Sequence, residues 1–230
     1  MNFESLSHAV YIMALPIFLA ALAAAAAAAA APAPPCYNPL NPNYETLCYS
    51  TTQTSGNISV RVIGAGVDGV LVTGMSAYTN FSTGSAASAV PLFEYFLMDN
   101  GSFQKIPLTV PLIFRPDPAG TWLASFALPT SKYPAAASAP SILPGSDLLL
   151  EEFAPPAPAA GRTVATYLFY TISEAGQADY EGACAALAAA LPAMGLSPVM
   201  GAWKEAWVTY STRAMVGDMK NECWMEVASN

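Results

Sequence analysis

The sequence predicts an α+β domain in which two long helices lie against one twisted antiparallel sheet, or open barrel, of about 8–9 strands. Helical patterns at 83–98 and 177–191 each stand between pairs of strand-like segments. The order strand, strand, helix, strand, strand therefore occurs twice. We expect two pseudo-symmetric halves, at about 57–130 and 146–228, within one domain that spans 57–230.

Composition and charge exclude several classes of partner. The chain has 230 residues, enough for one domain of ordinary size. Charged residues make up 10% of the chain, against ~25% in a typical soluble domain. The formal charge is −8 and the Lys and Arg residues are scattered singly, which argues against nucleic acid and against docking on anionic lipid. We expect a monomer.

The residue types needed for catalysis are scarce. The only histidine, His8, lies in the N-terminal segment, so the rest of the chain has no Ser-His-Asp or Cys-His mechanism and no histidine metal site. The four cysteines show no CxxC spacing, which disfavours zinc. Because no nucleophile–base pair or metal-ligand set is visible, we expect that the protein is not an enzyme.

Residues 1–31 are interpreted as a secretory signal peptide. An apolar run and an alanine tract precede a proline cluster at 32–35, and small residues before the prolines suit cleavage near 28–31. The run 9–31 is also long enough to span a bilayer, so a membrane anchor stays open, and a membrane is an expected partner only in that case. A plastid or other organellar transit peptide is a third alternative, although such peptides are Arg-rich and the first arginine here is Arg61.

Sequons and cysteines favour secretion or the endomembrane lumen. Three N-x-S/T sequons begin at Asn57, Asn80 and Asn100, at predicted turns or element ends, as N-glycans require. An even number of cysteines suits disulfides in an oxidising compartment. Four cysteines allow three pairings, and the sequence does not choose among them; a bridge between Cys36 and Cys48 would fix an extended arm at 32–56.

The first half opens with two strands, at 58–63 and 69–74. The first alternates in polarity and the second is a β-branched apolar run. Between them, 64–69 matches GxGxxG, but a strand follows it instead of a helix, and no acidic residue stands about 20 positions on. We therefore interpret this stretch as a glycine-rich hairpin turn and not as a nucleotide site.

The stretch 92–111 predicts the working surface. A helix capped by Thr83 or Ser85 and kinked or delayed by Pro91 ends there with apolar side chains, and a turn follows at 99–101. A strand is then expected at 105–114, and Pro107 and Pro111 within it predict an edge position or bulges. A helix next to such a strand leaves a shallow apolar groove, the predicted binding surface.

After strands at 105–115 and 121–128 and a long loop at 132–145, the second half repeats the pattern. Strands are expected at 147–153 and 163–172, and further strands at 198–211 and 221–227. The intervening helix at 177–191 carries one apolar stripe of Tyr180, Cys184, Leu187 and Leu191. We expect Trp203 and Trp224 in the core and Glu222 as a structural, hydrogen-bonding carboxylate.

Several motifs resemble those of the SOUL, or heme-binding protein, family over about 44–227. Lys105-Ile106-x-Leu108-Thr109-x-Pro111 resembles the K-I-x-M-T-x-P strand of that family, and 220–224 (KNECW) resembles its R-N-E-[IV]-W. The stretches 59–63 (SVRVI), 92–95 (LFEY) with Asn100, 126–129 (FALP) and 150–152 (LEE) also occur in the family's order.

The resemblance implies non-catalytic binding of heme or a related tetrapyrrole, between the first helix and the loop before the last strand. The ligand is a large flat apolar disc with two carboxylates, which suits apolar walls and a cation at the rim. The residues that match the implied site are Val90, Phe93, Leu97, Arg213, Met215, Met219 and Lys220.

The chain departs from this family in three ways. It has no histidine after His8, so axial ligation must come from Tyr, Met or Cys, or be absent. Ala86 and Glu94 stand where heme-binding members place basic residues on the first helix, and Leu108 replaces a methionine. The alternative is therefore a structural or protein-interaction module that kept the fold and lost the ligand, in which Phe93 and Leu97 are either core or contact residues.

Overall fold

The computed structural model describes residues 36–38, 41–63, 69–76, 78–153, 162–201, 204–210 and 219–229. These residues belong to one compact unit, Ala33–Asn230. Four of the sequence-based predictions concern residues outside the described ranges: the signal peptide at 1–31, the glycine-rich stretch 64–68, Trp203, and the ligand residues Arg213 and Met215.

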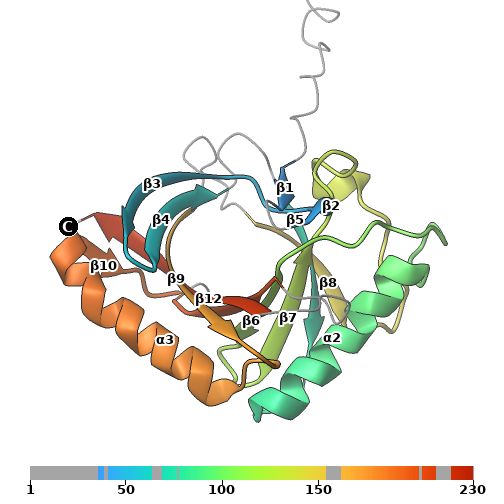
Figure 1. The fold of residues 1–230 in the computed structure, drawn as a ribbon. Helices are drawn as coiled ribbons and strands as arrows, with labels where there is room; N and C mark the ends of the chain where they lie inside the picture. Colours follow the sequence, from blue (N-terminus) through green and yellow to red (C-terminus); the bar gives the residue numbers. More distant parts are fainter. Residues whose placement is uncertain are drawn as a thin grey trace, which may run out of the picture. The chain divides into compact units, whose positions relative to one another are not determined.

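The fold is α+β, with one large antiparallel sheet and two long helices, as predicted. The helices are α2 (Phe81–Leu97) and α3 (Gln177–Ala190), and Figure 1 shows both on the convex side of the curved sheet. The sheet strands are β3 (Tyr49–Ser55), β4 (Ile58–Ile63), β5 (Val70–Met75), β6 (Leu112–Pro116), β7 (Trp122–Ala127), β8 (Leu148–Glu152), β9 (Arg162–Thr171), β10 (Leu196–Pro198), β11 (Ala206–Thr209) and β12 (Met219–Ser229).

The strand order confirms the two pseudo-symmetric halves. Along the sheet it runs β3-β4-β9-β12-β11-β6-β7-β5-β8, with β10 also paired to β12. Each strand of the first half has a counterpart in the second: β4 matches β8, β5 matches β9, β6 matches β11, and β7 matches β12. When every strand is replaced by its counterpart, the order from β4 to β8 is reversed. The two halves are therefore related by a pseudo-twofold axis between β6 and β11, and β3 and β8 form the edges of an open sheet.

Three predicted elements differ from the structure. The strands around the glycine-rich stretch do not pair with each other, because β4 pairs with β3 and β9 while β5 pairs with β7 and β8. The strand predicted at 105–114 starts only at Leu112, after Pro107 and Pro111. The remaining proline of β6, Pro116, is its last residue, and β6 lies in the middle of the sheet instead of at an edge. Within the strand predicted at 198–211, the structure has β11 at Ala206–Thr209, whereas β10 already ends at Pro198.

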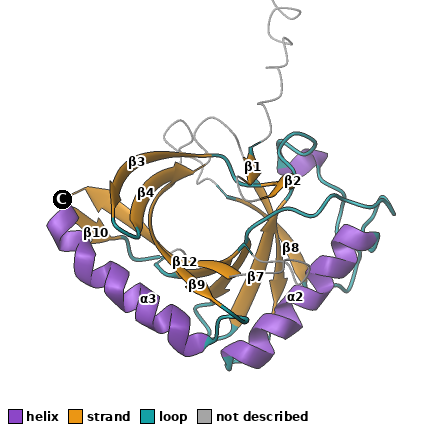
Figure 2. Ribbon diagram, in the orientation of Figure 1, coloured by secondary structure: helices purple, strands orange, loops and turns teal. Residues whose placement is uncertain are grey.

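The predicted N-terminal arm contains more regular structure than expected. A small separate sheet pairs β1 (Tyr37–Asn38) with β2 (Asn41–Glu45), and β3 joins the edge of the large sheet. A disulfide between Cys36 and Cys48, one of the pairings that the sequence left open, closes this region. Short 3-10 helices, η1 (Ala136–Ser138) and η2 (Leu191–Met194), lie in the long loop and after α3 (Figure 2).

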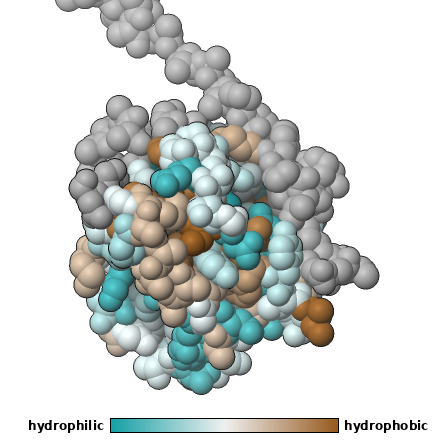
Figure 3. Space-filling view, turned by 60° about the vertical axis from the view of Figure 1, so that its left-hand side comes forward, coloured by the Kyte–Doolittle hydropathy of each residue, from teal (hydrophilic) through white to brown (hydrophobic). Residues whose placement is uncertain are grey.

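Both faces of the sheet are buried, and they differ in chemistry. The face toward the helices is aromatic and aliphatic, with Phe114, Phe126, Trp207 and Cys223 among its residues. The opposite face, called here the inner face, adds charged pairs to its apolar residues. Its basic side chains are Arg61, Arg115, Arg162 and Lys220, each within ion-pair distance of a glutamate. Four of the eight Lys and Arg residues of the chain therefore lie on this face. Figure 3 shows an outer surface on which pale and light-brown side chains alternate with hydrophilic ones.

Glycine 74 lets α2 approach the sheet. A Cβ built on Gly74 of β5 would lie 2.0 Å from the carbonyl oxygen of Ser88 in α2, well inside contact distance. Ser88 is fully buried there and donates its hydroxyl hydrogen to the carbonyl of Gly84 at 2.8 Å. Only glycine fits at this crossing, because the clashing atom belongs to a helix backbone that cannot rotate away.

We expect Gly74→Ala to destabilise the fold by about 1–3 kcal/mol, because the added methyl group pushes α2 away from β5. Urea denaturation followed by circular dichroism measures this loss. Gly182→Ala is the matched control, since nothing lies within 4 Å of its Cβ position in α3. That variant should gain up to about 1 kcal/mol through helix propensity. Equal effects of the two changes would contradict the packing argument.

Among the described residues, no helix has the length and apolar character needed to cross a bilayer.

Candidate functional site

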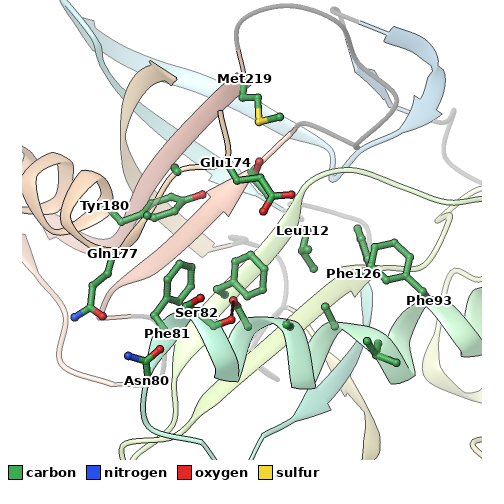
Figure 4. A pocket seen from close by; sticks show the side chains of 18 of the residues that line it. Asn80, Phe81, Ser82, Phe93, Leu112, Phe126, Glu174, Gln177, Tyr180 and Met219 are labelled. Carbon is green, nitrogen blue, oxygen red and sulfur yellow. Dashed lines mark hydrogen bonds between the residues drawn. The ribbon is translucent and has the colours of Figure 1, made fainter. Parts of the chain in front are cut away.

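A groove in the described surface follows α2 from Phe81 to Phe93 and faces the start of α3. Its volume is about 770 Å³, and β6, β11 and β12 contribute to it together with both helices (Figure 4). Its apolar lining consists of Phe81, Ala86, Ala89, Val90, Phe93, Val110, Leu112, Phe114, Phe126, Ala175, Tyr180 and Met219. Its other lining residues are Asn80, Ser82, Ser85, Glu174, Gly176, Gln177 and Thr209.

The sequence of α2 builds one wall. Asn80 caps the helix, its side-chain oxygen accepting a hydrogen bond from the backbone N–H of Thr83 at 3.3 Å. The helix therefore begins at Phe81, earlier than predicted, and continues through Pro91 to Leu97. Small residues face the sheet at Gly84 and Ser88, and larger apolar ones face it further along. Val90 and Phe93 turn outward, 55% and 41% exposed, and border the groove.

The start of α3 builds the opposite wall. Gly176 precedes the helix, and its backbone N–H donates to the carboxylate of Asp179 at 2.9 Å. One turn on, Tyr180 stacks on Trp207 with ring centroids 5.1 Å apart, and its hydroxyl lies 3.2 Å from the side-chain oxygen of Asn221. Burial raises the pKa of Tyr180 well above its usual value. Burial therefore favours the protonated phenol even more strongly than in a solvent-exposed tyrosine.

Aromatic rings form the floor. Phe81 lies edge-on to Phe114, Trp122 and Trp207, with centroids 5.5, 4.9 and 4.6 Å away. Phe93 lies edge-on to Phe126 at 5.5 Å. Such contacts hold rings in fixed orientations, so these aromatic faces and edges are preformed as a binding surface.

The structure brings together three of the seven predicted ligand residues. Val90, Phe93 and Met219 line the groove. Leu97 instead borders a separate shallow depression with Glu94, Met98 and Asp99. Lys220 points to the inner face, where its ammonium lies 3.5 Å from Glu222 and 4.2 Å from the ring centre of Tyr210. Arg213 and Met215 lie outside the described residues.

The charge at the groove differs from the sequence-based expectation. Among the described lining residues, Glu174 carries the only charged side chain, and Figure 4 shows its carboxylate near Met219. Glu94, which stands where heme-binding members of the family place a basic residue, belongs to the other depression. All four cysteines are in disulfides, so none is a free thiolate ligand. In the described part of the chain, no cluster of three or more His, Cys, Asp or Glu side chains could hold a metal ion.

The sequence reasoning missed the walls that come from distant segments. Phe114, Phe126 and Tyr180 reach the groove from β6, β7 and α3. For Tyr180 the helical stripe was a usable signal, since it placed this residue on the packed face of α3. The meeting of that face with α2 is a long-range contact that periodicity alone does not predict.

A scan against protein-family models and a search of curated proteins find no match to this chain. Among solved structures, the chain is similar to a crystal structure described as a hydrolase from Listeria innocua. The identity is 10%, the TM-score is 0.41, and the match covers 75% of this chain and 92% of that chain. A likeness at this level carries no argument about activity.

Proposed function

We propose that the groove between α2 and α3 binds heme or a related tetrapyrrole without catalysis, in a protein of the SOUL, or heme-binding, type. The observation that carries the proposal is the open groove of about 770 Å³ with preformed aromatic walls alongside α2. Ligand sites of this kind are concave, mainly apolar and about 300–1,000 Å³ in volume. The resemblance of the sequence motifs leads to the same helix.

The described residues suit the apolar ring of a tetrapyrrole better than the carboxylates at its edge. Phe93, Phe126 and Leu112 offer apolar surface to a flat macrocycle. Among the described lining residues Met219 supplies the only thioether, and none is a Lys or Arg that could pair with the ligand carboxylates. We therefore propose that burial of the ring provides most of the affinity and that the carboxylates point to water.

Secretion, or residence in the endomembrane lumen, is part of this proposal. Two disulfides, Cys36–Cys48 and Cys184–Cys223, are compatible with an oxidising compartment.

Titration of the protein with hemin and with metal-free protoporphyrin tests the function. Binding should shift the Soret band of hemin and quench tryptophan fluorescence at micromolar protein, and the two ligands should have similar affinities because no strong axial ligand is required. Absence of both signals would falsify the proposal. A much weaker affinity for the metal-free ring would show that a metal ligand dominates instead.

Phe93→Glu should raise the Kd of the porphyrin at least ~10-fold, equivalent to about 1.4 kcal/mol, because it places a carboxylate in the apolar wall. Leu97→Glu is the matched control, since Leu97 is 60% exposed on the same helix but does not line the groove. Its Kd should stay within about twofold of that of the unmodified protein. Isothermal titration calorimetry measures both values. Similar losses in the two variants would place the ligand on the outer helix face.

A second candidate function, a protein-interaction module, is favoured by a different observation. Val90, Phe93, Leu97 and Phe103 are 55%, 41%, 60% and 69% exposed, forming an apolar strip along α2 and the turn after it. A protein partner on this strip would lose affinity in both Phe93→Asp and Leu97→Asp, in contrast to a groove ligand. Recovery of a partner in a pull-down that is unchanged by both substitutions would contradict this second function.

A further inference from the structure

The three N-x-S/T sequons have different structural roles. We propose that Asn80, at the mouth of the groove, and Asn57, at a hairpin turn, accept N-linked glycans, whereas Asn100 is a structural residue that carries none. The proposal concerns modification of the protein and does not depend on the ligand of the groove.

Asn100 is fully buried and uses its side-chain amide completely. Its Nδ2 donates hydrogen bonds to the carbonyls of Tyr95 and Gln104, both at 2.8 Å. Its side-chain oxygen accepts from the backbone N–H of Ser102 at 3.2 Å. The amide thus closes the turn after α2. An N-linked sugar replaces one of the two hydrogens on Nδ2 and needs space outside the protein, so a glycan here is incompatible with the fold.

In Asn80, by contrast with Asn100, the side-chain nitrogen Nδ2 is available. Its side chain is exposed, and its oxygen caps α2 by accepting from the N–H of Thr83 at 3.3 Å. No hydrogen bond to a described residue uses its Nδ2, and Figure 4 shows that nitrogen turned away from the helix. A glycosylated asparagine keeps its carbonyl oxygen, so the sugar can be attached while the cap is retained. The hydroxyl residue of this sequon, Ser82, is also exposed.

Asn57 lies in the turn between β3 and β4. It is exposed, and Gly56 before it takes a positive φ of 57° that turns the chain. Its backbone carbonyl accepts from the N–H of Leu168 at 2.9 Å, and no described residue contacts its side-chain amide by a hydrogen bond. This arrangement fixes the backbone and leaves the side chain available.

The modification requires a lipid-linked oligosaccharide as co-reactant and the transferase that uses it. Nδ2 forms a bond to the anomeric carbon of the first sugar and loses one proton. The bond between that carbon and the diphosphate oxygen breaks, and the polyprenyl diphosphate leaves with the electron pair. No redox change is involved. The glycan on Asn80 then stands at the α2–α3 end of the groove, beside Gln177, and leaves the end at Phe93 open.

Expression of the full chain in a eukaryotic secretory host tests the assignment. Glycans are removed with an amidase in heavy-oxygen water, which marks each modified asparagine as labelled aspartate, and peptides are read by mass spectrometry. We expect label at positions 57 and 80 and none at 100. Label at 100 in the folded protein, or absence of label at 80, would overturn the proposal.

Sequon variants that keep every asparagine provide the control. Ser82→Ala should increase electrophoretic mobility by one glycan, and the helix cap should be retained because Asn80 is unchanged. Ser102→Ala should leave the mobility unchanged, because Asn100 carries no glycan. The turn should also be retained, since the backbone N–H of residue 102 is the group that donates to Asn100. A mobility change in the second variant, or none in the first, contradicts the proposal.

Discussion

Glu222→Gln is expected to lower the free energy of unfolding by about 3–5 kcal/mol, because it leaves Arg61 with an uncompensated charge inside the protein. Glu222 is fully buried on the inner face of β12, and the Arg61 side chain is 9% exposed. The two groups form a bidentate pair with distances of 2.8 and 2.9 Å. The hydroxyl of Tyr210 at 3.0 Å and the indole N–H of Trp224 at 2.7 Å also donate to the carboxylate, and the ammonium of Lys220 lies 3.5 Å away.

The effect is large because the pair connects strands that are not neighbours. Arg61 comes from β4 and Glu222 from β12, and β9 lies between these strands. The pair therefore joins the first half of the chain to the second across the inner face. An amide at position 222 keeps the shape but cannot balance the guanidinium, and it must present donors where four donors already converge.

The pH dependence provides an independent readout of this pair. Burial alone would raise the pKa of Glu222, but the hydrogen bonds and charge of Arg61, with the charge of Lys220 and the hydrogen bond of Trp224, lower it below the usual range. A carboxylate whose pKa is lower in the folded state than in the unfolded state stabilises the fold. That stabilisation is fully present above the unfolded-state pKa, and it is lost as the pH falls through the folded-state pKa. The wild type should thus lose this contribution below about pH 4.5, whereas Glu222→Gln has none to lose.

Calorimetry of the two proteins from about pH 7 to about pH 3 measures both effects. The midpoint of unfolding of the variant should be lower by on the order of 10 °C at neutral pH, and the difference should narrow in acid. Glu226→Gln is the control. Its partner Arg162, 2.5 Å away, also contacts the carbonyl of Phe153, and the Glu226 side chain is 22% exposed. That variant should lose clearly less, and equal losses would contradict the role of burial.

Local residue patterns predicted most of the helices and strands. The errors concern which strands pair, because pairing depends on residues far apart in the sequence. The alternation of Ile58–Ile63 and the apolar stripe of α3 depend only on near neighbours, so both were predicted within a residue or two. The glycine-rich stretch after β4 indicates a turn but does not determine the partner strand. β9 occupies the place next to β4, and its pairing depends on residues about 100 positions away.

The sequence predicted the part of the groove that α2 forms, but only some of the residues that the strands contribute. Val90 and Phe93 are three residues apart on one helix, so their common face follows from the helical period. Met219 and Lys220 are neighbours in β12, and adjacent side chains of a strand point to opposite faces. Because β12 was expected only from 221, both were predicted to line one groove as loop residues. The earlier start of the strand directs Lys220 to the inner face.

Loss of the Cys184–Cys223 disulfide should have the second large effect, about 4 kcal/mol for a loop of 39 residues. The sequence left this pairing open. The bridge ties α3 to β12, and both sulfur atoms lie in the aromatic and aliphatic core on the helix face. Besides Cys184, the buried residues of α3 are Tyr180, Ala183 and Leu187, so few other side chains anchor the helix. The double substitution Cys184→Ala and Cys223→Ala should therefore loosen α3 as well as lower stability.

Loosening of α3 can be measured as a loss of ligand binding, because this helix forms one wall of the groove. Tyr180 and Gln177, one wall of the groove, lie on the first turns of α3 ahead of Cys184. The matched control is the double alanine variant of Cys36 and Cys48, whose loop of 12 residues corresponds to about 3 kcal/mol. Urea denaturation should show a loss in both, with the larger in the first. Porphyrin affinity, measured where both variants are folded, should fall only when Cys184 and Cys223 are changed. An unchanged affinity there would mean that packing of Tyr180 on Trp207 is sufficient to hold the wall.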